Sequence, residues 1–555
     1  MKLTSAVRFA VAVNTLCSTA ASILPLSAPP AYVPFDRTRD FTSSFALDAW
    51  ATPVTFEYST PEPHDKNWIG IWPASGGGPE EGHRVADHAS AWEYAEDSAG
   101  RRYINVDNLG AGDYRAYFLA KDIYVSLAAP FNFYYPGYKA TLYFPSNETS
   151  LRNAREGEAY LENVGGLVIG EGHSIHINFQ KAGGDDWIQV WPDGSIRGTP
   201  PAGSGGRIAV AQVEGKAADT APASIQINIM VQRSSERLVD SINVMTWSMW
   251  DSGTHFSRYH EKQMRFILGS NVDLIAFQDI AEVPIDHLER IANALGWWRW
   301  RGDLRVAIIS RYPIVAEFSQ IVTDYFNPGG GVRVSLNGLN QDDKVAIEFW
   351  SVALFPLPYG PNEFCKRDRP LTQQQVLANE VHSERMVQLK ATMDRIIPQI
   401  DNSSGSTTPT ILAGDFNAPS HLDWVDSLKE KNCGVGGGFP WPSSIIVTAA
   451  GMDDSLRVAN PDPAKYLGTT WNIRKLSDPQ DRIDFVYGSK DLEVLASVNT
   501  VGGGDPKARD PEWTSDHAAI VSLSAFREPE PSVNQGAVST QHLRYLFWMM
   551  FRIIF

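Results

Sequence analysis

The hydrophobic pattern of this chain changes near Val239, and that change constrains the fold more than any other feature. Before Val239, short segments such as 54–58 and 68–72 alternate apolar and polar side chains, and turn-rich stretches such as 75–79 separate them. This alternation is typical of antiparallel β-sandwiches. After Val239, continuous apolar runs alternate with segments of helical spacing. With 555 residues, the chain is therefore expected to form β-rich modules followed by a mixed α and β domain.

The part after Val239 has the pattern of a two-sheet sandwich flanked by helices, an α+β fold of four layers. Residues 257–269 and 375–397 carry apolar side chains at helical spacing. The candidate buried strands are 242–246, 274–277, 306–309, 346–350 and 410–413. The fold class that we predict is thus multidomain, with two N-terminal all-β sandwiches ahead of this α+β domain.

Two segments ahead of the domain carry turns that resemble those of known β-modules. The first contains Asn67-Trp-Ile-Gly and Gly110-Ala-Gly-Asp-Tyr-Arg, and it is similar to a β-sandwich module that precedes nuclease-like domains in fungal secreted proteins. The second contains Asp193-Gly-Ser-Ile-Arg-Gly-Thr-Pro200 and resembles an immunoglobulin-like repeat, whose turn uses glycine to reach positive φ. We interpret both as scaffolds rather than as ligand sites.

The start of the chain predicts secretion. Lys2 and Arg8 precede an apolar stretch at 9–16 and small residues at 18–22, which is the pattern of a cleaved signal peptide. The apolar run at 545–555 is shorter than the roughly 20 residues that span a bilayer, so no transmembrane span is expected. The expected organisation is signal peptide 1–21, linker 22–40, β-sandwich 41–137, immunoglobulin-like module 141–232, α+β domain 239–526 and tail 527–555.

Cysteine and asparagine patterns agree with an extracellular location. Cys17 would leave with the signal peptide, so Cys365 and Cys433 would remain. A lone pair of cysteines in an oxidising compartment is often a disulfide, although sequence alone does not show that the two meet. Asn147 and Asn402 each begin an N-glycosylation sequon. The chain is therefore expected to be an extracellular glycoprotein.

The net charge of the chain is −16, and its isoelectric point is about 5.2. Such a chain has no basic field with which to attract a phosphate backbone. A long nucleic acid is therefore possible but not favoured as a partner. The sequence does not indicate an oligomeric state.

Four motifs occur in a fixed order in the C-terminal half. They are 304–314, Gly414-Asp415-Phe416-Asn417, Arg482-Ile-Asp484-Phe-Val-Tyr487 and Ser515-Asp516-His517. In this order they resemble the endonuclease/exonuclease/phosphatase superfamily over roughly half of the chain. Taken singly, Asp-Phe-Asn could be only an Asx-turn and Asp-His only a surface cap. The shared order is what favours a catalytic site.

The resemblance implies hydrolysis of a phosphate ester with Mg²⁺, or with Mn²⁺ or Ca²⁺, which neutralises the phosphate while water attacks in line. It implies that Asp415 orients or deprotonates this water and that Asn417 holds a phosphate oxygen. His517 would donate a hydrogen bond to the phosphate, with a nearby carboxylate fixing its tautomer. Asp516 would belong to the metal shell.

Three positions depart from the family's pattern. Ser248 stands where the family has asparagine, and Asp279 replaces its metal-binding glutamate, so metal binding by these two is expected to be weakened rather than excluded. Ala353 stands where most secreted relatives have histidine, and alanine has no donor or acid. Asp484 would normally hold that histidine, so we expect Asp484 to lose its partner.

Two functions fit these residues. The first is a secreted metal-dependent phosphoesterase that is weakened by the three departures, because loss of an acid commonly costs about 10²- to 10⁴-fold in rate. The alternative is a catalytically degenerate relative that binds a surface glycan, a lipid head group or a protein. His255 and His382 could replace the missing acid, but we interpret each as a surface residue. The identity of the substrate cannot be predicted from the fold.

Overall fold

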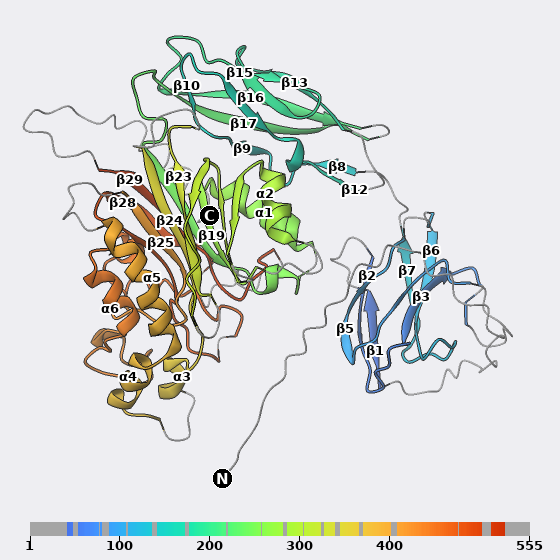
Figure 1. Cartoon of the computed structure of the whole chain (residues 1–555). Helices are drawn as coiled ribbons and strands as arrows, with labels where there is room; N and C mark the ends of the chain where they lie inside the picture. The colour runs from blue at the N-terminus through green and yellow to red at the C-terminus, as the bar shows by residue number, and fades with distance from the viewer. Residues whose placement is uncertain are drawn as a thin grey trace, which may run out of the picture. The chain divides into compact units, whose positions relative to one another are not determined.

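The computed structural model of the chain forms two compact units, Met1–Tyr138 and Lys139–Phe555, which are described separately (Figure 1). The expected signal peptide, the linker, Asn402 and almost all of the expected tail lie outside the described residues. In the part of the chain that the structure describes, no helix is long and apolar enough to cross a membrane. The described residues are 42–47, 54–76, 78–79, 88–106, 109–110, 112–135, 141–171, 177–217, 220–256, 258–280, 286–302, 305–323, 327–338, 345–365, 370–400, 408–475, 477–501 and 512–527.

The first unit consists of two small antiparallel sheets. A three-stranded sheet has the order β1-β2-β5, and a four-stranded sheet has the order β4-β3-β6-β7. Apolar side chains of both sheets form one buried core. The strands are β1 (Ser44–Leu47), β2 (Thr55–Ser59), β3 (Trp68–Pro73), β4 (Ala91–Tyr94), β5 (Ala99–Tyr103), β6 (Gly112–Leu119) and β7 (Phe131–Tyr135).

Strand β3 shows how residues that alternate along the sequence are sorted onto the two faces of a sheet. Ile69 and Ile71 belong to the core of the unit, whereas Trp68 and Trp72 pack into a separate aromatic cluster. Side chains alternate between the two faces of a strand, so one residue type serves each face. Gly70 lies between the indole rings, where an added Cβ would come within 2.6 Å of Trp72. Both faces of this sheet are therefore packed.

The second unit starts with a strand-rich segment. Its long strands β16 and β17 form a hairpin in the middle of a sheet with the order β10-β17-β16-β13. A smaller sheet has the order β11-β15-β14. Gly194, in the expected glycine turn, has a φ of +82°. The strands are β8 (Thr141–Tyr143), β9 (Glu148–Ser150), β10 (Ala154–Arg155), β11 (Tyr160–Asn163), β12 (Ile169–Glu171), β13 (Asn178–Gly184), β14 (Gln189–Val190), β15 (Ser195–Gly198), β16 (Arg207–Lys216) and β17 (Ala223–Gln232), with a 3₁₀ turn at Gly165–Leu167.

This segment shares a hydrophobic core with the residues that follow it, although the sequence suggested a module of its own. Ile227 and Ile229 of β17 belong to the same buried cluster as Met264 and Ile291 further along the chain. The Asn153 side chain also donates a hydrogen bond to the carbonyl oxygen of Leu238 at 2.8 Å. The segment is thus packed onto the C-terminal domain within one compact unit.

The C-terminal domain contains two six-stranded sheets. The first has the order β20-β21-β19-β18-β29-β28, and the second has the order β22-β23-β24-β25-β27-β26. Apolar side chains from both sheets meet in one core between them. The strands of the first sheet are β18 (Ser241–Ser248), β19 (Leu274–Gln278), β20 (Trp298–Arg301), β21 (Val306–Ser310), β28 (Leu492–Asn499) and β29 (Ile520–Phe526). Those of the second are β22 (Ile314–Glu317), β23 (Gly329–Ser335), β24 (Ala346–Ala353), β25 (Thr410–Asp415), β26 (Asp453–Asp454) and β27 (Asp484–Gly488).

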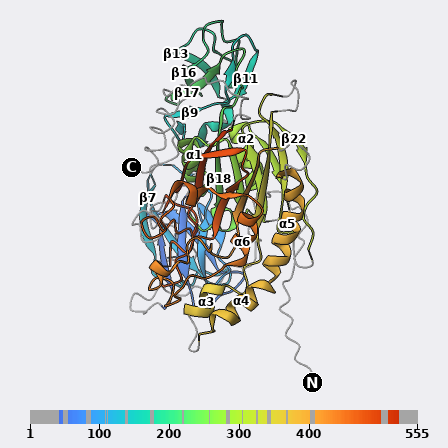
Figure 2. The ribbon, with the colours of Figure 1, turned by 90° about the vertical axis from the view of Figure 1, so that its left-hand side faces the viewer.

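Helices cover the outer faces of both sheets (Figures 1 and 2). Helices α1 and α2 pack on the first sheet, together with the strand-rich segment. Helices α5 and α6 pack on the second sheet. The helices are α1 (Tyr259–Ser270), α2 (His287–Leu295), α3 (Gly360–Cys365), α4 (Gln373–Val381), α5 (Glu384–Ile400), α6 (Pro442–Ala449) and α7 (Ser455–Ala459), with 3₁₀ turns at Asp251–Gly253 and Asp426–Leu428.

The expected helix over 375–397 is in fact two helices. Helix α4 ends at Val381, and α5 begins at Glu384 after His382 leaves the helical conformation. The break places the Arg385 side chain, which is fully buried, against the carboxylate of Glu380 at 3.1 Å. An apolar periodicity that continues through both helices concealed this break.

Candidate functional site

Two carboxylates lie side by side on neighbouring strands of the second sheet. Asp415 ends β25 and Asp484 begins β27, and the antiparallel register places them opposite each other. Ala353, the last residue of β24, is the register partner of Asp415 on the other side. The exposed fraction is 6% for Asp415 and 0% for Asp484. Strand register therefore fixes a row of Ala353, Asp415 and Asp484.

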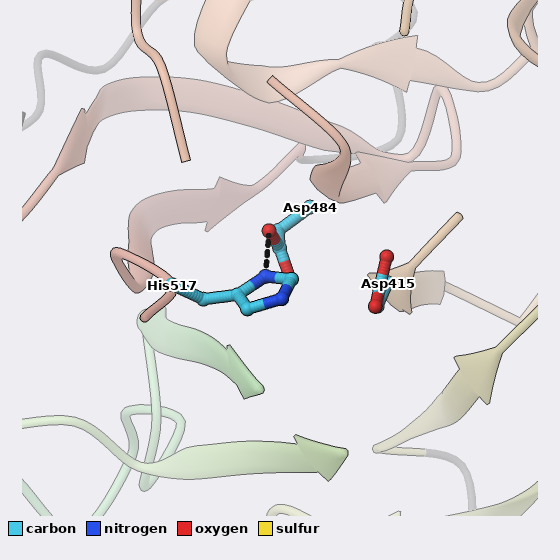
Figure 3. Close-up of side chains that lie close together, drawn as sticks. All are labelled: Asp415, Asp484 and His517. Atoms are coloured by element: carbon cyan, nitrogen blue, oxygen red, sulfur yellow. Dashed lines mark hydrogen bonds and ion pairs between the residues drawn. The ribbon is translucent and has the colours of Figure 1, made fainter. Parts of the chain in front are cut away.

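His517 joins this row from the loop before β29. Its Nδ1 atom lies 2.9 Å from Oδ2 of Asp484, and its backbone N–H donates to the Ser515 hydroxyl at 3.0 Å. One ligand atom from each of Asp415, Asp484 and His517 lies within 4.8 Å of the others (Figure 3). We call these three residues the acid–histidine group.

The expectation that Asp484 loses its partner was wrong. Asp484 is the carboxylate that orients the His517 ring, so its hydrogen bond does not depend on position 353. The sequence placed both residues in motifs but could not show which acid meets which histidine, because that pairing depends on how β27 and the loop before β29 meet. The loss at Ala353 therefore removes a group beside Asp415 and leaves the Asp484–His517 pair intact.

The electrostatics of the group follow from its burial. Burial and the nearby charge of Asp484 raise the pKa of Asp415 to about 7. Burial alone would lower the pKa of His517, but the Asp484 carboxylate and its hydrogen bond raise it to about 10. Oδ1 of Asp484 is buried and has no hydrogen-bond partner among the described residues. The group thus combines a buried imidazolium with two crowded carboxylates and one orphaned oxygen.

Asn417 positions Asp415 from the next turn of the chain. Its backbone N–H donates to Oδ1 of Asp415 at 2.8 Å, and its Nδ2 donates to Oδ2 at 3.0 Å. Nδ2 also donates to the carbonyl oxygen of Leu354 at 3.0 Å, and Asn417 has a φ of +51°, which asparagine tolerates better than most residues. Both oxygens of Asp415 are therefore held, and the amide nitrogen of Asn417 is already engaged by the protein.

Arg385 is a supporting residue that the sequence did not indicate. Its NH1 atom donates to the carbonyl oxygens of Phe355 at 2.9 Å and Asn417 at 2.6 Å, and its NH2 atom also donates to Pro358. The side chain ties the loop after β24 to the loop after β25. Its charge is balanced by Glu380, and only the fold brings these segments together.

The residues expected to complete a metal shell, Ser248, Asp279 and Asp516, are called the rim residues below. Asp279 accepts the backbone N–H of Asp251 at 3.0 Å and lies 3.5 Å from the Arg305 guanidinium. Asp516 accepts the indole N–H of Trp471 at 3.0 Å. Ser248 is buried, and its carbonyl oxygen accepts from the Ser515 hydroxyl at 2.6 Å.

Neither rim carboxylate belongs to the described group of residues whose ligand atoms converge within 4.8 Å. Their oxygens instead contact donors of the protein itself. The contribution of Ser248, Asp279 and Asp516 to a metal shell therefore stays a prediction, while the described ligand atoms that converge are those of Asp415, Asp484 and His517. The backbone around Asp279 is irregular: Asp279 has a φ of +54°, and Trp250, Asp251 and Ser252 beside it also have positive φ values.

Two histidines that could have replaced the acid missing at Ala353 make other contacts. Nε2 of His255 lies 3.0 Å from Oδ2 of Asp251, and its ring packs at a tilt against the ring of Trp250. Nδ1 of His382 lies 2.8 Å from the carbonyl oxygen of Ala378 in its own helix. Both side chains are exposed, so the interpretation of each as a surface residue agrees with the structure.

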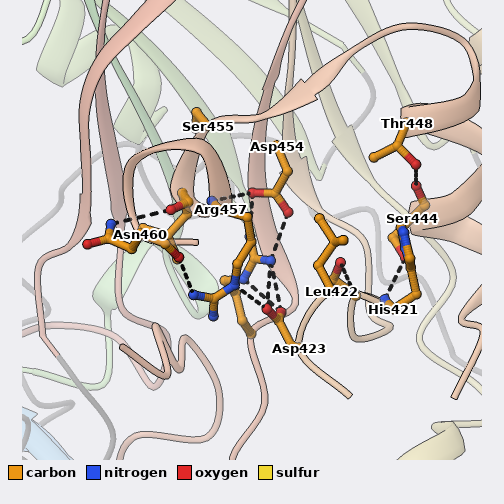
Figure 4. Close-up of polar contacts among 12 residues, drawn as sticks. His421, Leu422, Asp423, Ser444, Thr448, Asp454, Ser455, Arg457 and Asn460 are labelled. Atoms are coloured by element: carbon orange, nitrogen blue, oxygen red, sulfur yellow. Dashed lines mark hydrogen bonds and ion pairs between the residues drawn. The ribbon is translucent and has the colours of Figure 1, made fainter. Parts of the chain in front are cut away.

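A buried ion-pair network supports the start of β27. Arg482, two residues before Asp484, donates to both carboxylates of Asp423 and Asp454 at distances of 2.8 to 3.0 Å. Arg457 adds a bond to Asp423 at 2.5 Å (Figure 4). Such a network is costly to break, because removal of one partner leaves a buried charge unpaired. Arg482 stood in a recognised motif, but its two acidic partners could not be predicted.

Cys365 and Cys433 form a disulfide across 68 residues of sequence. It joins the end of α3 to a loop that packs on a cluster of aromatic rings. Phe364, next to Cys365, contacts both Trp424 and Phe439 in this cluster. The disulfide thus fixes a loop region on the same side of the domain as α3 and α4.

A model of the endonuclease/exonuclease/phosphatase family matches residues 256–517. This range contains the whole acid–histidine group. Residues 256–517 form an endonuclease/exonuclease/phosphatase family domain. The match also includes Asp279 and Asp516, whereas Ser248 precedes it.

Individual relatives of this domain are distant. An uncharacterised protein of Caenorhabditis elegans is 26% identical over 311 residues, which cover 52% of this chain and 92% of that protein. An endonuclease/exonuclease/phosphatase from Beutenbergia cavernae has a TM-score of 0.35 at 14% identity and covers 55% of this chain and 76% of its own. Truncated TDP2 of C. elegans has a TM-score of 0.34 at 17% identity, with 51% of this chain and 98% of its own covered.

Proposed function

We propose that this protein is a secreted, divalent-metal-dependent phosphoesterase. The observation that carries the proposal is the acid–histidine group, in which two buried carboxylates and an oriented histidine converge within 4.8 Å. Burying three ionisable side chains together is costly for stability, and strongly perturbed pKa values cluster at functional sites. The group lies in the endonuclease/exonuclease/phosphatase domain, whose family hydrolyses phosphoesters.

The donor set fits a hard divalent cation such as Mg²⁺, or Mn²⁺ or Ca²⁺. The unpartnered Oδ1 of Asp484 would hold it, because hard cations prefer carboxylate oxygen. When bound, the cation supplies positive charge that neutralises the phosphate. Ser248, Asp279 and Asp516 are proposed as more distant contributors, since their present contacts are with the protein.

The protein's own side chains supply the remaining chemistry. Asp415, held at both oxygens by Asn417, orients the attacking water and accepts its proton. His517 donates a hydrogen bond to the phosphate from its second ring nitrogen, which points to the side on which Asp415 lies (Figure 3). Asp484 keeps that ring in place through Nδ1. Asn417 is proposed as the residue that positions Asp415, with its side-chain oxygen facing substrate or solvent.

Secretion is part of the proposal and is supported by the signal-like start of the sequence and by the Cys365–Cys433 disulfide. The substrate is a phosphate ester of unidentified structure. The net charge of −16 argues against a long nucleic acid as the preferred substrate. The strand-rich segments ahead of the domain are proposed to be scaffolds.

A second candidate function is favoured by Ala353 and by the contacts of the rim. With no donor or acid at position 353 and with Asp279 in contact with Arg305, the domain could serve as an extracellular binding protein that no longer catalyses. The retained hydrogen bonds of Asp415, Asn417, Asp484 and His517 make us prefer the enzyme.

A hydrolysis assay with the mature secreted chain separates the two functions. Bis-nitrophenyl phosphate and nitrophenyl phosphate serve as a diester and a monoester, each measured with Mg²⁺, with Mn²⁺ and after chelation. We expect metal-dependent release of nitrophenol that chelation abolishes and added metal restores. Release at the rate of buffer alone for both esters would favour the binding protein.

A further inference from the structure

We propose that Gln263, in helix α1, is a positioning residue that holds the rim carboxylates Asp279 and Asp516 in place for a divalent cation. This inference rests on the proposed phosphoesterase function. Gln263 lies outside the sequence motifs of the domain, and its side chain is fully buried. A buried amide needs partners for both its nitrogen and its oxygen, and the partners of Gln263 are what point to its role.

The amide nitrogen of Gln263 joins two loops that are far apart in the sequence. Nε2 donates to the carbonyl oxygen of Ser252 at 2.9 Å and to the hydroxyl oxygen of Thr514 at 3.1 Å. An added Cβ at Gly253 would come within 2.4 Å of this nitrogen, so the first loop packs directly against it. One NH₂ group thus connects the 3₁₀ turn at Asp251–Gly253 to the segment before β29.

Each of these loops leads to a rim carboxylate. In the 3₁₀ turn, the backbone N–H of Asp251 donates to Oδ2 of Asp279, and the N–H of Ser252 donates to the carbonyl oxygen of Asp279, both at 3.0 Å. In the other loop, Thr514 lies two residues before Asp516. The Gln263 amide therefore sets the position of one rim carboxylate relative to the other.

His287, in helix α2, fixes the orientation of this amide. A carbonyl oxygen accepts hydrogen bonds and cannot donate them, so the contact with Ser252 requires the NH₂ side of Gln263 to face the loops. Oε1 then faces His287, whose Nε2 lies 2.6 Å away and donates to it. His287 is itself buried. Both ends of the amide are thus engaged, and helices α1 and α2 determine where the two loops meet.

A hydrogen-bond arrangement of this kind affects metal binding, because Mg²⁺ demands near-octahedral geometry from its ligands. Loss of a residue that orients metal ligands from behind commonly costs about 10- to 100-fold in metal affinity or activity. The hydroxyl of Ser515 also ties the second loop to the carbonyl oxygen of Ser248 at 2.6 Å, and this link would remain. We therefore expect a loss at the lower end of that range when the amide of Gln263 is removed.

The test measures binding of Mn²⁺ to the metal-free full chain by isothermal titration calorimetry, together with hydrolysis of bis-nitrophenyl phosphate. Gln263→Met keeps the length of the side chain without its amide, and Thr514→Val removes only the hydroxyl that accepts from it. The matched control is Thr392→Val, since Thr392 is also buried and its hydroxyl donates to the carbonyl oxygen of Gln388 within α5 at 2.9 Å. We expect Gln263→Met to weaken Mn²⁺ binding about tenfold, Thr514→Val about threefold, and Thr392→Val not at all.

The outcomes separate this inference from the proposed function. If the parent protein binds Mn²⁺ and hydrolyses the ester while folded Gln263→Met binds Mn²⁺ as tightly as the parent, Gln263 only stabilises the packing of α1. The inference is then overturned, and the phosphoesterase function stands. If Gln263→Met does not fold, the Mn²⁺ affinity of Thr514→Val decides in the same way. An equal loss in Thr392→Val would show a general effect of losing a buried hydroxyl and would also overturn the inference.

Two results with the parent protein concern the proposed function itself. If the parent binds Mn²⁺ but does not hydrolyse the ester, the phosphoesterase function fails, and the Mn²⁺ affinities of the variants still decide the role of Gln263. If the parent neither binds Mn²⁺ nor hydrolyses the ester, both proposals fail together.

Discussion

The acid–histidine group and the rim residues lie in one domain but are built in different ways. Asp415 and Asp484 are placed by strand register, and His517, in the loop before β29, is held by its contact with Asp484. Asp279 and Ser248 lie where strands run into a segment with positive φ at Trp250, Asp251 and Ser252. The comparison teaches that strand register and the Asp484–His517 contact bring the acid–histidine group together, whereas the carboxylates of Asp279 and Asp516 contact donors of the protein itself.

The largest expected effect distinguishes these two regions by mutation. His517→Gln or Asp484→Asn should lower kcat/KM for bis-nitrophenyl phosphate about a hundredfold or more, because each removes the oriented donor at the phosphate. Asp279→Asn should cost less than either, since Arg305 and the Asp251 N–H already contact its oxygens. Steady-state kinetics with circular dichroism as a folding control check this. If Asp279→Asn lowers kcat/KM as much as His517→Gln or Asp484→Asn does, the expected difference between the two regions is wrong.

A smaller effect is expected on folding stability when the pH is lowered. It arises at the contact between helices α1 and α2, which contain Gln263 and His287. His287 is bonded through Nε2 to Gln263 at 2.6 Å, and Gln263 in turn donates to Ser252 and Thr514. Burial, helped by Arg290, lowers the pKa of His287 to about 3 from 6.5, so the folded state holds this ring neutral. The unfolded chain then takes up a proton that the folded chain does not, as pH falls below 6.5.

The stability that His287 contributes is therefore complete above pH 6.5 and is lost as pH falls toward 3. Urea denaturation at pH 7.5 and 5.5 should show a loss of about 1 kcal/mol from this residue. His260, whose pKa is also lowered to about 3 by burial, should add a similar amount. The variant His287→Gln should show a smaller pH dependence than the parent; an unchanged dependence would refute the assignment.

The smallest effect expected is a gain in activity when a donor is placed at position 353, beside Asp415. Ala353→His would place a donor beside Asp415, and we expect kcat/KM to rise about tenfold, because an imperfectly placed acid recovers only part of its usual contribution. Ala353→Leu is the control for added volume at a buried position and should give no gain. If the Ala353→His variant is folded and no faster than the parent, the missing donor at position 353 is not what limits the rate.

Much of the fold could be predicted from local patterns. The expected strands at 242–246 and 274–277 lie within β18 and β19, and that at 410–413 lies within β25, because buried strands leave continuous apolar runs. The break between α4 and α5 was missed, since it is set by the Arg385 contacts and not by periodicity. The shared core of the strand-rich segment and the domain was also missed, because it joins residues that are far apart in the sequence.

The site could be predicted only in part. The motifs identified Asp415, Asp484 and His517 as members of one site, and the structure brings them together. The sequence could not assign Asp484 to His517, and it gave no sign of the acidic partners of Arg482. These contacts join residues that are far apart in sequence, so they depend on the assembled sheets rather than on any local pattern.

The central claim is that the acid–histidine group performs metal-dependent phosphoester hydrolysis, and Asp415→Ala tests it most directly. Both oxygens of Asp415 are held by Asn417, so truncation removes a positioned carboxylate from a site that is otherwise retained. We predict Mg²⁺-dependent hydrolysis of bis-nitrophenyl phosphate by the parent protein and a loss of kcat/KM of about a hundredfold or more in Asp415→Ala. A folded Asp415→Ala variant that hydrolyses the ester as fast as the parent would contradict the account.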